Sequence, residues 1–262
     1  MDVFGEFAKY YDLIHEKKNY LKESAYINEL IQNYNPGAKT ILDVGCGTGN
    51  YAFAMQELDY QVNGVDSSSD MIQIANGKLS KSKYISSSPS FSCGRMEDYD
   101  CQKKFDAVIC LFFSLCYQTT DDLIFKSLSR FKDQIKDNGI LIFDFWHKDG
   151  VLGQKPELKI QNYLTEDLEI TKLVQPKLNV SFDCVGIDYT FYLENKKNEI
   201  SKFKEFHNLR YLNPKLLVKF LKELSFKVLK IEGWMTEQKL QENEWSGIIV
   251  AMPDWSQSSK KT

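Results

Sequence analysis

Apolar positions in the first 146 residues follow two different spacings. The stretches "KFDAVICLFF" and "NGILIFDFW" are near-continuous apolar runs, as in strands that are covered on both faces of a parallel sheet. Residues 22–34 instead place Tyr26, Ile27, Leu30, Ile31 and Tyr34 on one helical face. The "NPG" that follows predicts the end of that helix.

The same spacings predict the remaining elements of this half. Strands are expected at 39–44 and 61–66, with a helix at 49–57 between them. Ser67 and Asp70 have the spacing of a capping box and predict the start of another helix. Between the two apolar runs we expect a helix that ends at a glycine, with Ile124, Leu128, Phe131 and Ile135 on one face. Strand and helix therefore alternate from 39 to 146, which predicts an α/β fold with a doubly wound sheet.

Period-2 patterning replaces this alternation from about 158 to 211. Its clearest example is Ile187, Tyr189, Phe191 and Leu193, which the polar turn "ENKKNE" follows. We interpret this region as an antiparallel insert. Asn213 and Pro214 then predict a cap and a first-turn proline for a helix, and two strands, "FKVLKIEGW" and "WSGIIVAMP", follow.

The chain accordingly divides into a core with two additions. Residues 1–150 form the predicted cofactor-binding core with an N-terminal helical lid, and 151–212 form the insert, either a substrate lid or a dimer interface. Residues 213–253 return to the core, and 254–262 are a predicted tail.

Charge and composition exclude several classes of protein. The 33 basic and 36 acidic side chains leave a net charge of −3, so nucleic acid is not an expected partner. The acidic start "MDVFGEFAKYYD" is unlike a signal peptide, and the longest apolar run, 107–116, is too short to span a bilayer. We therefore expect a cytoplasmic protein whose six cysteines are reduced and structural.

The stretch "TILDVGCGTGN" at 40–50 carries the strongest chemical signal. Gly45, Gly47 and Gly49 between a strand and a helix would let a ligand approach the backbone closely, with helix N–H groups aimed at it. A dinucleotide site requires G-x-G-x-x-G, whereas the spacing here is G-x-G-x-G with Asp43 just before it. Because an acid at that place disfavours an anion, a cationic or zwitterionic cofactor fits better.

Asp66 supports this interpretation. It ends the second predicted strand, where a carboxylate can accept hydrogen bonds from both hydroxyls of a ribose. The two motifs together indicate a nucleoside cofactor without a pyrophosphate.

Other candidates have weaker patterns. Tyr117 and Trp146 follow predicted strands at the edge where open α/β sheets bind ligands, although core packing would also explain both. If the protein transfers a group to a hydroxyl, a base would be needed. His15, His147 and His207 are the candidates for that base, with packing or surface roles as the alternative.

Five motifs in order, "ILDVGCGTG", "VNGVDSSSDM", "CGRMEDYD", "FDAVICLFFSLCY" and "NGILIFDFW", resemble the class I S-adenosylmethionine-dependent methyltransferases. That resemblance implies a Rossmann-like seven-stranded sheet. Within the class, the chain looks most like bacterial N-methyltransferases of nucleotide-linked amino sugars, the group that makes desosamine and mycaminose. The shared features are the "YYDLIHEKKNY" opening, the F-S-x-x-Y run, a Trp after the fifth strand and the antiparallel insert.

The resemblance also implies roles for residues. Gly45, Gly47 and Gly49 would cradle the methionine part and ribose of S-adenosylmethionine, and Asp66 would hold the ribose. The residues implied around the rest of the cofactor are Met71, Met96 and Glu97 at the adenine, Leu111 beneath the cofactor, and Tyr11 and Tyr20 at its carboxylate. One departure is Arg95, which stands where the family has an acid that accepts from the adenine amino group.

The expected reaction is methyl transfer to the amino group of a nucleotide-linked amino sugar, a displacement that requires orientation and no metal. Tyr117 and His147 are the candidate catalytic residues, and His15, Trp146 and Arg210 are candidates for acceptor contact, Arg210 through a diphosphate. The alternatives are another small amine, an amino acid or a hydroxyl as acceptor, a dehydrogenase, and a binding protein without activity. A homodimer is possible in each case.

Overall fold

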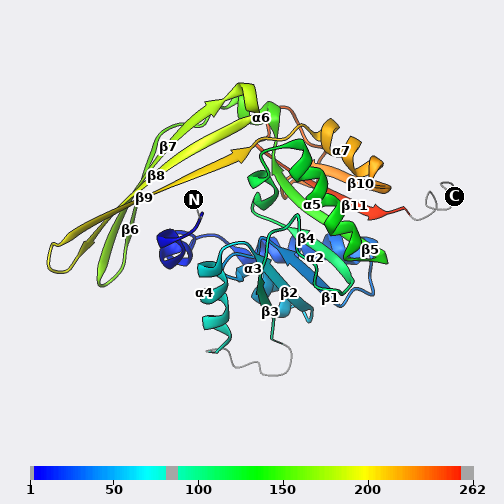
Figure 1. The fold of residues 1–262 in the computed structure, drawn as a ribbon, viewed down its shortest axis with the longest axis horizontal. Coiled ribbons are helices and arrows are strands. Elements are labelled where there is room, and N and C mark those ends of the chain that lie inside the picture. The colour runs from blue at the N-terminus through cyan, green and yellow to red at the C-terminus, as the bar shows by residue number, and fades with distance from the viewer. Residues whose placement is uncertain (1–2, 81–87, 255–262) are drawn as a thin grey trace.

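The larger of two sheets runs in the order β10-β11-β5-β4-β1-β2-β3 in this computed structural model, which describes residues 3–80 and 88–254 (Figure 1). Its strands are β1 Thr40–Val44, β2 Gln61–Asp66, β3 Ser90–Cys93, β4 Phe105–Cys110, β5 Ile135–Trp146, β10 Phe226–Gly233 and β11 Ser246–Pro253. Neighbours from β3 to β5 are parallel, whereas β11 is antiparallel to β5 and β10. The predicted doubly wound, seven-stranded α/β sheet is confirmed.

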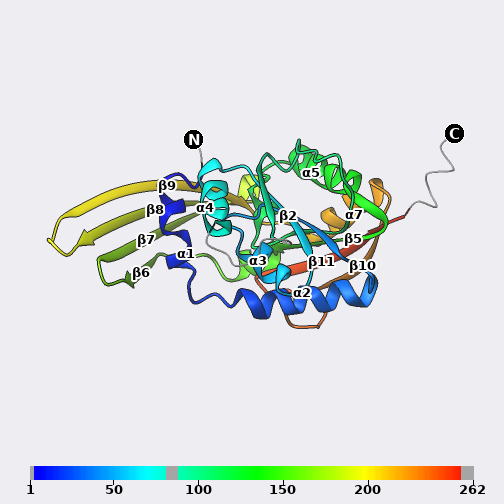
Figure 2. The same ribbon diagram turned by 90° about the horizontal axis from the view of Figure 1, so that it is seen from below.

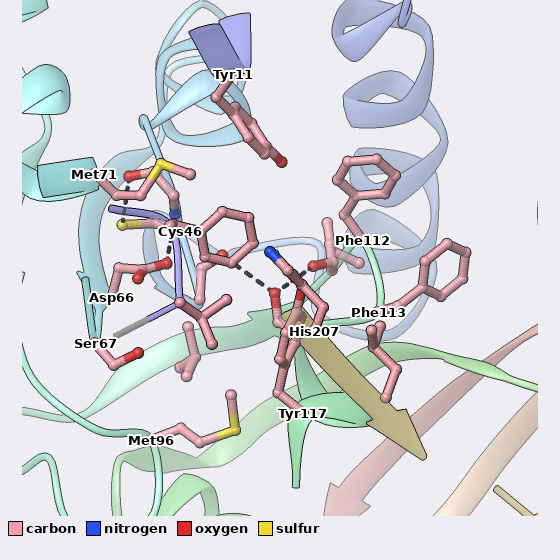
Figure 3. A pocket seen from close by; sticks show the side chains of 18 of the residues that line it. Tyr11, Cys46, Asp66, Ser67, Met71, Met96, Phe112, Phe113, Tyr117 and His207 are labelled. Carbon is pink, nitrogen blue, oxygen red and sulfur yellow. Dashed lines mark hydrogen bonds between the residues drawn. The ribbon is translucent and has the colours of Figure 1, made fainter. Parts of the chain in front are cut away.

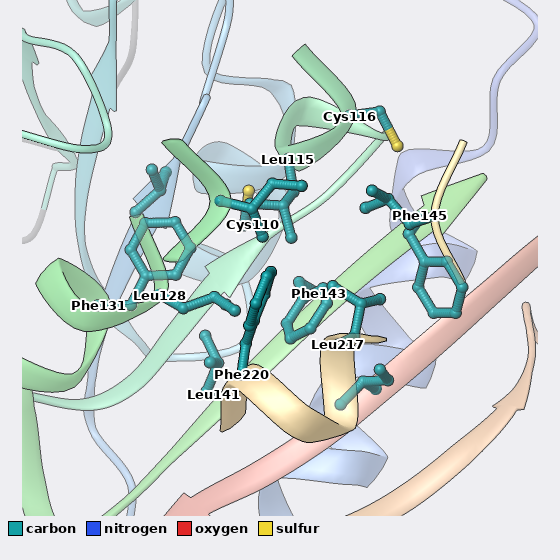
Figure 4. Close-up of a cluster of buried hydrophobic side chains, with 14 of the residues drawn as sticks. Cys110, Leu115, Cys116, Leu128, Phe131, Leu141, Phe143, Phe145, Leu217 and Phe220 are labelled. Carbon is teal, nitrogen blue, oxygen red and sulfur yellow. The ribbon is translucent and has the colours of Figure 1, made fainter. Parts of the chain in front are cut away.

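Helices cover both faces of this sheet. They are α2 Tyr20–Tyr34, α3 Asn50–Gln56, α4 Ser69–Leu79, α5 Asp121–Asp133, α6 Lys148–Gly153 and α7 Pro214–Glu223. Alternate residues of β4 face opposite layers, because Val108 packs in the cluster with α5 and α7, whereas Ile109 packs with α2 and α3. Figure 4 shows the first cluster, in which Phe220 of α7 lies beside Phe143 of β5 and Phe131 of α5 lies beside Leu128.

The second sheet is the predicted antiparallel insert. It contains β6 Lys159–Leu164, β7 Leu168–Asn179, β8 Cys184–Asn195 and β9 Ile200–Arg210, paired in chain order, with the short helix η3 Val180–Phe182 between β7 and β8. Both views show this sheet extending away from the larger one (Figures 1 and 2). These strands lie inside the predicted 151–212 segment, and the domain boundaries themselves remain a prediction.

The chain before α2 packs on the insert. The short helices η1 Glu6–Tyr10 and α1 Tyr11–Ile14 belong to residues 3–15, which we call the N-terminal segment. Phe7 and Ile14 are buried against Ile170, Phe191 and Leu193 of the second sheet. This contact places the N-terminal segment between the insert and the carboxyl edge of the larger sheet (Figure 2).

Two sequence predictions of helix boundaries are wrong. Ser68, not Ser67, caps α4, since its Oγ accepts from the Met71 N–H at 3.2 Å. Helix α5 ends at Asp133 without a glycine stop, and Ile135 begins β5. Gly139 lies inside β5, where a Cβ would approach the Phe105 carbonyl at 2.9 Å, so strand packing explains this glycine.

Other predictions concern single residue types and the termini. The six cysteines are free, as predicted, and Cys46, Cys110, Cys116 and Cys184 are buried. Within the described ranges, no helix has the length and apolar character that a membrane span requires. Apart from Asp254, the predicted tail 254–262 lies outside the described residues.

Candidate active site

A cavity of about 550 Å³ lies where the carboxyl edge of the larger sheet meets the N-terminal segment and the insert (Figure 3). Its lining comes from the turn after β1, the ends of β2 and β4, and strands β7, β8 and β9. Open α/β sheets bind ligands at this edge. The cavity is therefore the candidate active site, with one wall from each sheet.

The turn after β1 leaves room for a ligand at one glycine. Gly45, Gly47 and Gly49 have φ values of 74°, 54° and 82°, in the region that favours glycine. A Cβ on Gly45 would lie 2.5 Å from the Ser114 side chain, and one on Gly49 would lie 2.6 Å from Phe91. A Cβ on Gly47 would meet nothing within 4 Å, although Gly47 lines the cavity. This open space beside the backbone suits a bound molecule.

Asp43 lies beneath this turn. Its side chain is buried, and its Oδ2 has no hydrogen-bond partner among the described residues. Burial, with a smaller contribution from the charge of Asp66, raises the pKa of Asp43 to about 7. An unpartnered buried carboxylate oxygen requires a donor or a positive charge nearby, which fits the cationic cofactor predicted from the sequence.

Asp66 is held by two backbone donors at the end of β2. Its Oδ2 accepts from the Gly47 N–H and its Oδ1 from the Ser68 N–H, both at 2.8 Å. Burial raises the pKa of Asp66, although these hydrogen bonds oppose the shift. Each oxygen keeps a further lone pair, and Asp66 lines the cavity, so the carboxylate can accept from both hydroxyls of a ribose.

The adenine side of the predicted site contains Met71, Met96 and Glu97, which all line the cavity. Glu97 is buried and already paired, since the Arg95 Nε donates to its Oε1 at 2.5 Å and the Gln118 amide donates to its Oε2 at 3.1 Å. Arg95 therefore does not substitute for the acid that the resemblance leads one to expect there. It neutralises the neighbouring acid and fixes its position.

The loop after β4 forms the floor beside Leu111. Phe112 and Phe113 both have left-handed backbone, with φ values of 58° and 64°. The carboxylate of Asp144 accepts from both of their N–H groups, at 2.9 and 2.7 Å. Burial outweighs these hydrogen bonds and raises the pKa of Asp144 to about 7. Asp144 thus stabilises a strained loop that turns aromatic side chains toward the cavity.

The N-terminal segment closes the cavity and is tied to the core. Tyr11 and Tyr20, for which the resemblance implies a place at the cofactor carboxylate, both line the cavity, and that role stays a prediction. Asp12 accepts from the Thr48 hydroxyl at 2.6 Å and forms an ion pair with Lys78 at 2.7 Å. These contacts join the segment to the glycine turn and to α4.

A hydroxyl, an imidazole and a carboxylate form a chain at the acceptor side. The Tyr117 hydroxyl lies 2.7 Å from His207 Nδ1, and His207 Nε2 lies 3.2 Å from Glu205 Oε2. Glu205 also accepts from the backbone N–H groups of Phe4 and Phe7. Burial alone would raise the pKa of Glu205, but the hydrogen bonds from His207 and these N–H groups outweigh it and lower the pKa.

The pKa shifts of Tyr117 and Glu205 indicate where the protons lie in this hydrogen-bonded group. Burial, with the neighbouring Tyr189 and acidic groups, raises the pKa of Tyr117 well above its ordinary value, so its phenol keeps its proton. The consistent arrangement is that Tyr117 donates to Nδ1 while Nε2–H donates to the Glu205 carboxylate. Tyr117 and His207 face each other in the cavity (Figure 3).

Of the predicted acceptor contacts, His15 and Trp146 line the cavity. His15 Nδ1 lies 2.9 Å from the Tyr11 carbonyl. Burial lowers the pKa of His15 to about 4, helped by the charges of Lys172 and Lys18, even though the hydrogen bond to Tyr11 opposes the shift. His15 is therefore a neutral ring with Nε2 as its remaining acceptor.

Four predicted residues lie away from the lining: Asp43 and Gly49, described above, and the two that follow. His147 is buried, and its Nδ1 is 3.0 Å from the Glu244 carbonyl, which is a packing role between β5 and the chain before β11. Arg210, at the end of β9, forms an ion pair with Asp121 of α5 at 2.6 Å. The structure brings neither side chain to the cavity.

Sequence reasoning missed Lys172 and Glu205 and gave His207 no definite role. All three come from the insert, where alternation predicts which residues share a face but not which other segment covers that face. A signal existed for Lys172, since it interrupts the apolar face that Ile170 and Val174 share with it.

The sheet order and the glycine turn define the class I methyltransferase fold. Residues 41–139 match a family model described as a methyltransferase domain. This part of the chain is similar to methyltransferase domains of the S-adenosylmethionine-dependent class, and the open space at Gly47 leaves room for a ligand beside the backbone.

Three proteins illustrate the range of relatives. A dTDP-3-amino-3,6-dideoxy-alpha-D-glucopyranose N,N-dimethyltransferase from Streptomyces fradiae is 29% identical over 147 residues, 55% of each chain. A glycine/sarcosine N-methyltransferase from Aphanothece halophytica is 28% identical over 63% of this chain and 61% of its own. The aligned part thus spans little more than half of either relative. The crystal structure of an S-adenosylmethionine-dependent methyltransferase from Clostridium acetobutylicum superposes with a TM-score of 0.79 at 22% identity, covering 95% and 98% of the two chains.

Proposed function

We propose that this protein transfers a methyl group from S-adenosylmethionine to the amino nitrogen of a nucleotide-linked amino sugar. The observation that carries the proposal is that Tyr117 and His207 line the same cavity as Asp66 and the glycine turn, with Glu205 hydrogen-bonded to His207 behind them. One cavity thus combines a nucleoside-binding edge with a group that can accept a proton. The similarity to an amino-sugar dimethyltransferase supports the choice of acceptor.

The residues that would hold the cofactor are those at the carboxyl edge of the larger sheet. Asp66 would accept from the ribose hydroxyls, the backbone at Gly45 and Gly47 would lie along the methionine part, and Met71 would contact the adenine. When bound, the cofactor supplies a methyl group on a positively charged sulfur. The buried Asp43 carboxylate and the half-buried Asp66 carboxylate provide negative potential for that charge when ionised.

The protein's own chemical task is to remove a proton from the methylated nitrogen. An ammonium N–H can donate to the Tyr117 oxygen, and its proton can pass there as the Tyr117 proton moves to His207 Nδ1. The imidazolium that results is stabilised by the Glu205 carboxylate. The high pKa of Tyr117 keeps the phenol neutral in the resting site, so it acts as a relay and not as the final base.

The aromatic walls exclude water from this transfer. Phe4 and Phe7 of the N-terminal segment pack their rings at 4.8 and 5.9 Å from the His207 ring, and Tyr189 packs against it at 4.8 Å. Fewer waters in the site strengthen the interaction of the imidazolium with Glu205 and protect a neutral amine from competing solvation.

A turnover screen tests the proposal. The full-length protein is incubated with S-adenosylmethionine and a panel of nucleotide-linked amino sugars, sugar alcohols and amino acids, and formation of S-adenosylhomocysteine is measured. Turnover with an amino sugar nucleotide and not with its deaminated, hydroxyl-bearing counterpart supports N-methylation. Turnover confined to the hydroxyl compounds would reject it, and absence of S-adenosylhomocysteine binding by calorimetry would indicate a protein without this activity.

A further inference from the structure

Lys172 of β7 is a buried cation on the insert wall of the cavity. Only 6% of its surface is exposed, and it lies opposite Phe191 in the β7–β8 register. Its Nζ stands 5.0 Å from the Phe7 ring centroid, 4.4 Å from that of Tyr189 and 5.8 Å from that of Phe191. The ammonium group is therefore enclosed by three aromatic rings.

The sequence around Lys172 does not explain its burial. Ile170 and Val174 flank it on the same face of β7, and Ile170 is fully buried against the N-terminal segment. A strand face of this kind is completed most simply by another apolar residue. Lysine is instead placed where its flexible stem packs on rings and its charged end reaches the cavity.

Among the described residues, no carboxylate lies within ion-pair distance of Lys172, and no oxygen accepts from its three donors. The nearest acid on the same sheet face, Glu205, is already engaged by His207 and by the N–H groups of Phe4 and Phe7. The faces of the surrounding rings offset only part of the free-energy cost of burying an ammonium group. Burial accordingly lowers the pKa of Lys172 to about 8.

We propose that Lys172 binds an anionic oxygen of the methyl acceptor, a phosphate or a carboxylate oxygen. This assignment rests on the proposed function, since it places the acceptor between the insert wall and the cofactor edge. A lysine is a point charge with rotatable donors and accommodates either anion. An anion at Lys172 completes its hydrogen bonds and holds the acceptor amine on the side of the cavity that contains Tyr117.

The two possible sources of the anion differ in chemistry. A nucleotide-linked sugar carries a diphosphate, whereas an amino acid acceptor carries a carboxylate next to its amine. Each anion can be probed with a simple compound: thymidine 5′-diphosphate for the diphosphate and glycine for the carboxylate. Binding of these probes does not require turnover, which separates this proposal from the reaction itself.

The test is calorimetric titration of each probe into the full-length protein, with and without saturating S-adenosylhomocysteine. The wild-type protein is compared with Lys172→Met, with the conservative Lys172→Arg, and with Lys177→Met. Lys177 lies on the same strand, and its side chain is 83% exposed, so it gives a matched loss of charge outside the cavity. We expect Lys172→Met to bind at least one probe about tenfold more weakly or worse, while Lys172→Arg and Lys177→Met remain within about threefold of wild type.

The outcomes are distinct. Loss of thymidine diphosphate binding alone assigns a phosphate, and loss of glycine binding alone assigns a carboxylate. Equal affinities of Lys172→Met and wild type, or no binding of either probe to wild type, would overturn the role of Lys172 even if S-adenosylhomocysteine binds normally. Failure of S-adenosylhomocysteine to bind would instead count against the proposed function, and the titrations without it would still show whether Lys172 binds an anion.

Discussion

The Tyr117 hydroxyl and His207 Nδ1 lie 2.7 Å apart, although one residue follows β4 of the larger sheet and the other lies in β9 of the insert. The pair is formed only when the two sheets are packed together through the cavity. Ninety residues of sequence separate its members. The acceptor side of the site is therefore a property of the assembled fold and not of any local motif.

Replacement of Tyr117 by phenylalanine should lower kcat about 100-fold, because the proton then has no hydroxyl through which to reach His207. Calorimetry should show an unchanged affinity for S-adenosylhomocysteine, and the KM for the acceptor should change little. Tyr192→Phe, a substitution on the partly exposed face of β8, is the matched control. A Tyr117→Phe variant with wild-type kcat would exclude the relay.

Asp66→Asn should weaken S-adenosylhomocysteine binding about tenfold or more. The amide keeps one acceptor oxygen, but its NH₂ group replaces the second oxygen that a ribose hydroxyl requires and opposes the N–H of Gly47 or Ser68. Isothermal titration measures the change. Asp70→Asn, in the exposed first turn of α4, should leave the affinity within error. If both variants bind alike, Asp66 has no role in the nucleoside site.

Gly47→Ala separates cofactor space from protein stability. The added Cβ meets no protein atom within 4 Å. The free energy of unfolding should therefore fall by only about 1 kcal/mol, because of the strain of alanine at positive φ. Binding of S-adenosylhomocysteine should fall about tenfold or more because the methyl group occupies the ligand's space. Gly37→Ala, also free of neighbours, serves as the control. Normal binding by Gly47→Ala would show that the open space at the turn is unused.

Asp106 provides a pH-dependent test of the fold. Burial opposes ionisation, but hydrogen bonds from Thr40 and Lys136 outweigh it and lower the pKa of Asp106 to about 2. A depressed folded-state pKa stabilises the protein above about pH 4, and the contribution disappears as the pH falls through 2.

Urea unfolding of Asp106→Asn should therefore show a loss of about 1 to 2 kcal/mol at pH 7 that shrinks between pH 4 and 2. Asp98→Asn, at an exposed position, should show no such pH dependence. A loss of equal size at pH 7 and at pH 2.5 would mean that the charge of Asp106 is not its cause.

The larger sheet could be predicted because its strands are buried on both faces. Such strands are mostly apolar, as β4 is apart from Asp106 and as residues 140–146 of β5 are apart from Asp144, and the glycines and Asp66 mark the ends of β1 and β2. Strand β3 was not predicted because it is a short edge strand, and its residues Ser90, Ser92 and Cys93 are exposed. The predicted helix extended beyond Asp133 because Ile135 happens to continue the helical spacing of Ile124, Leu128 and Phe131, although it is a buried residue of β5.

The site divides in the same way. The glycines, Asp66 and Leu111 stand at or just after the ends of strands, so the position of each strand fixes their place at the sheet edge. His207 and Lys172 reach the cavity only through the angle at which the insert packs, and no short-range pattern encodes that angle. Arg210 was predicted to contact the acceptor, but its guanidinium forms an ion pair with Asp121 outside the cavity, a partner that no sequence pattern indicated.

The Asp144 carboxylate widens the choice of residues that can form the bend beside the cavity. Left-handed backbone ordinarily selects glycine, which contributes no surface for binding. The Asp144 carboxylate, on the neighbouring strand β5, accepts hydrogen bonds from the N–H groups of Phe112 and Phe113. These bonds offset the strain of the left-handed backbone, so the bend tolerates two large rings. Sharp curvature and an aromatic floor, normally alternatives at a single position of a protein chain, coexist here.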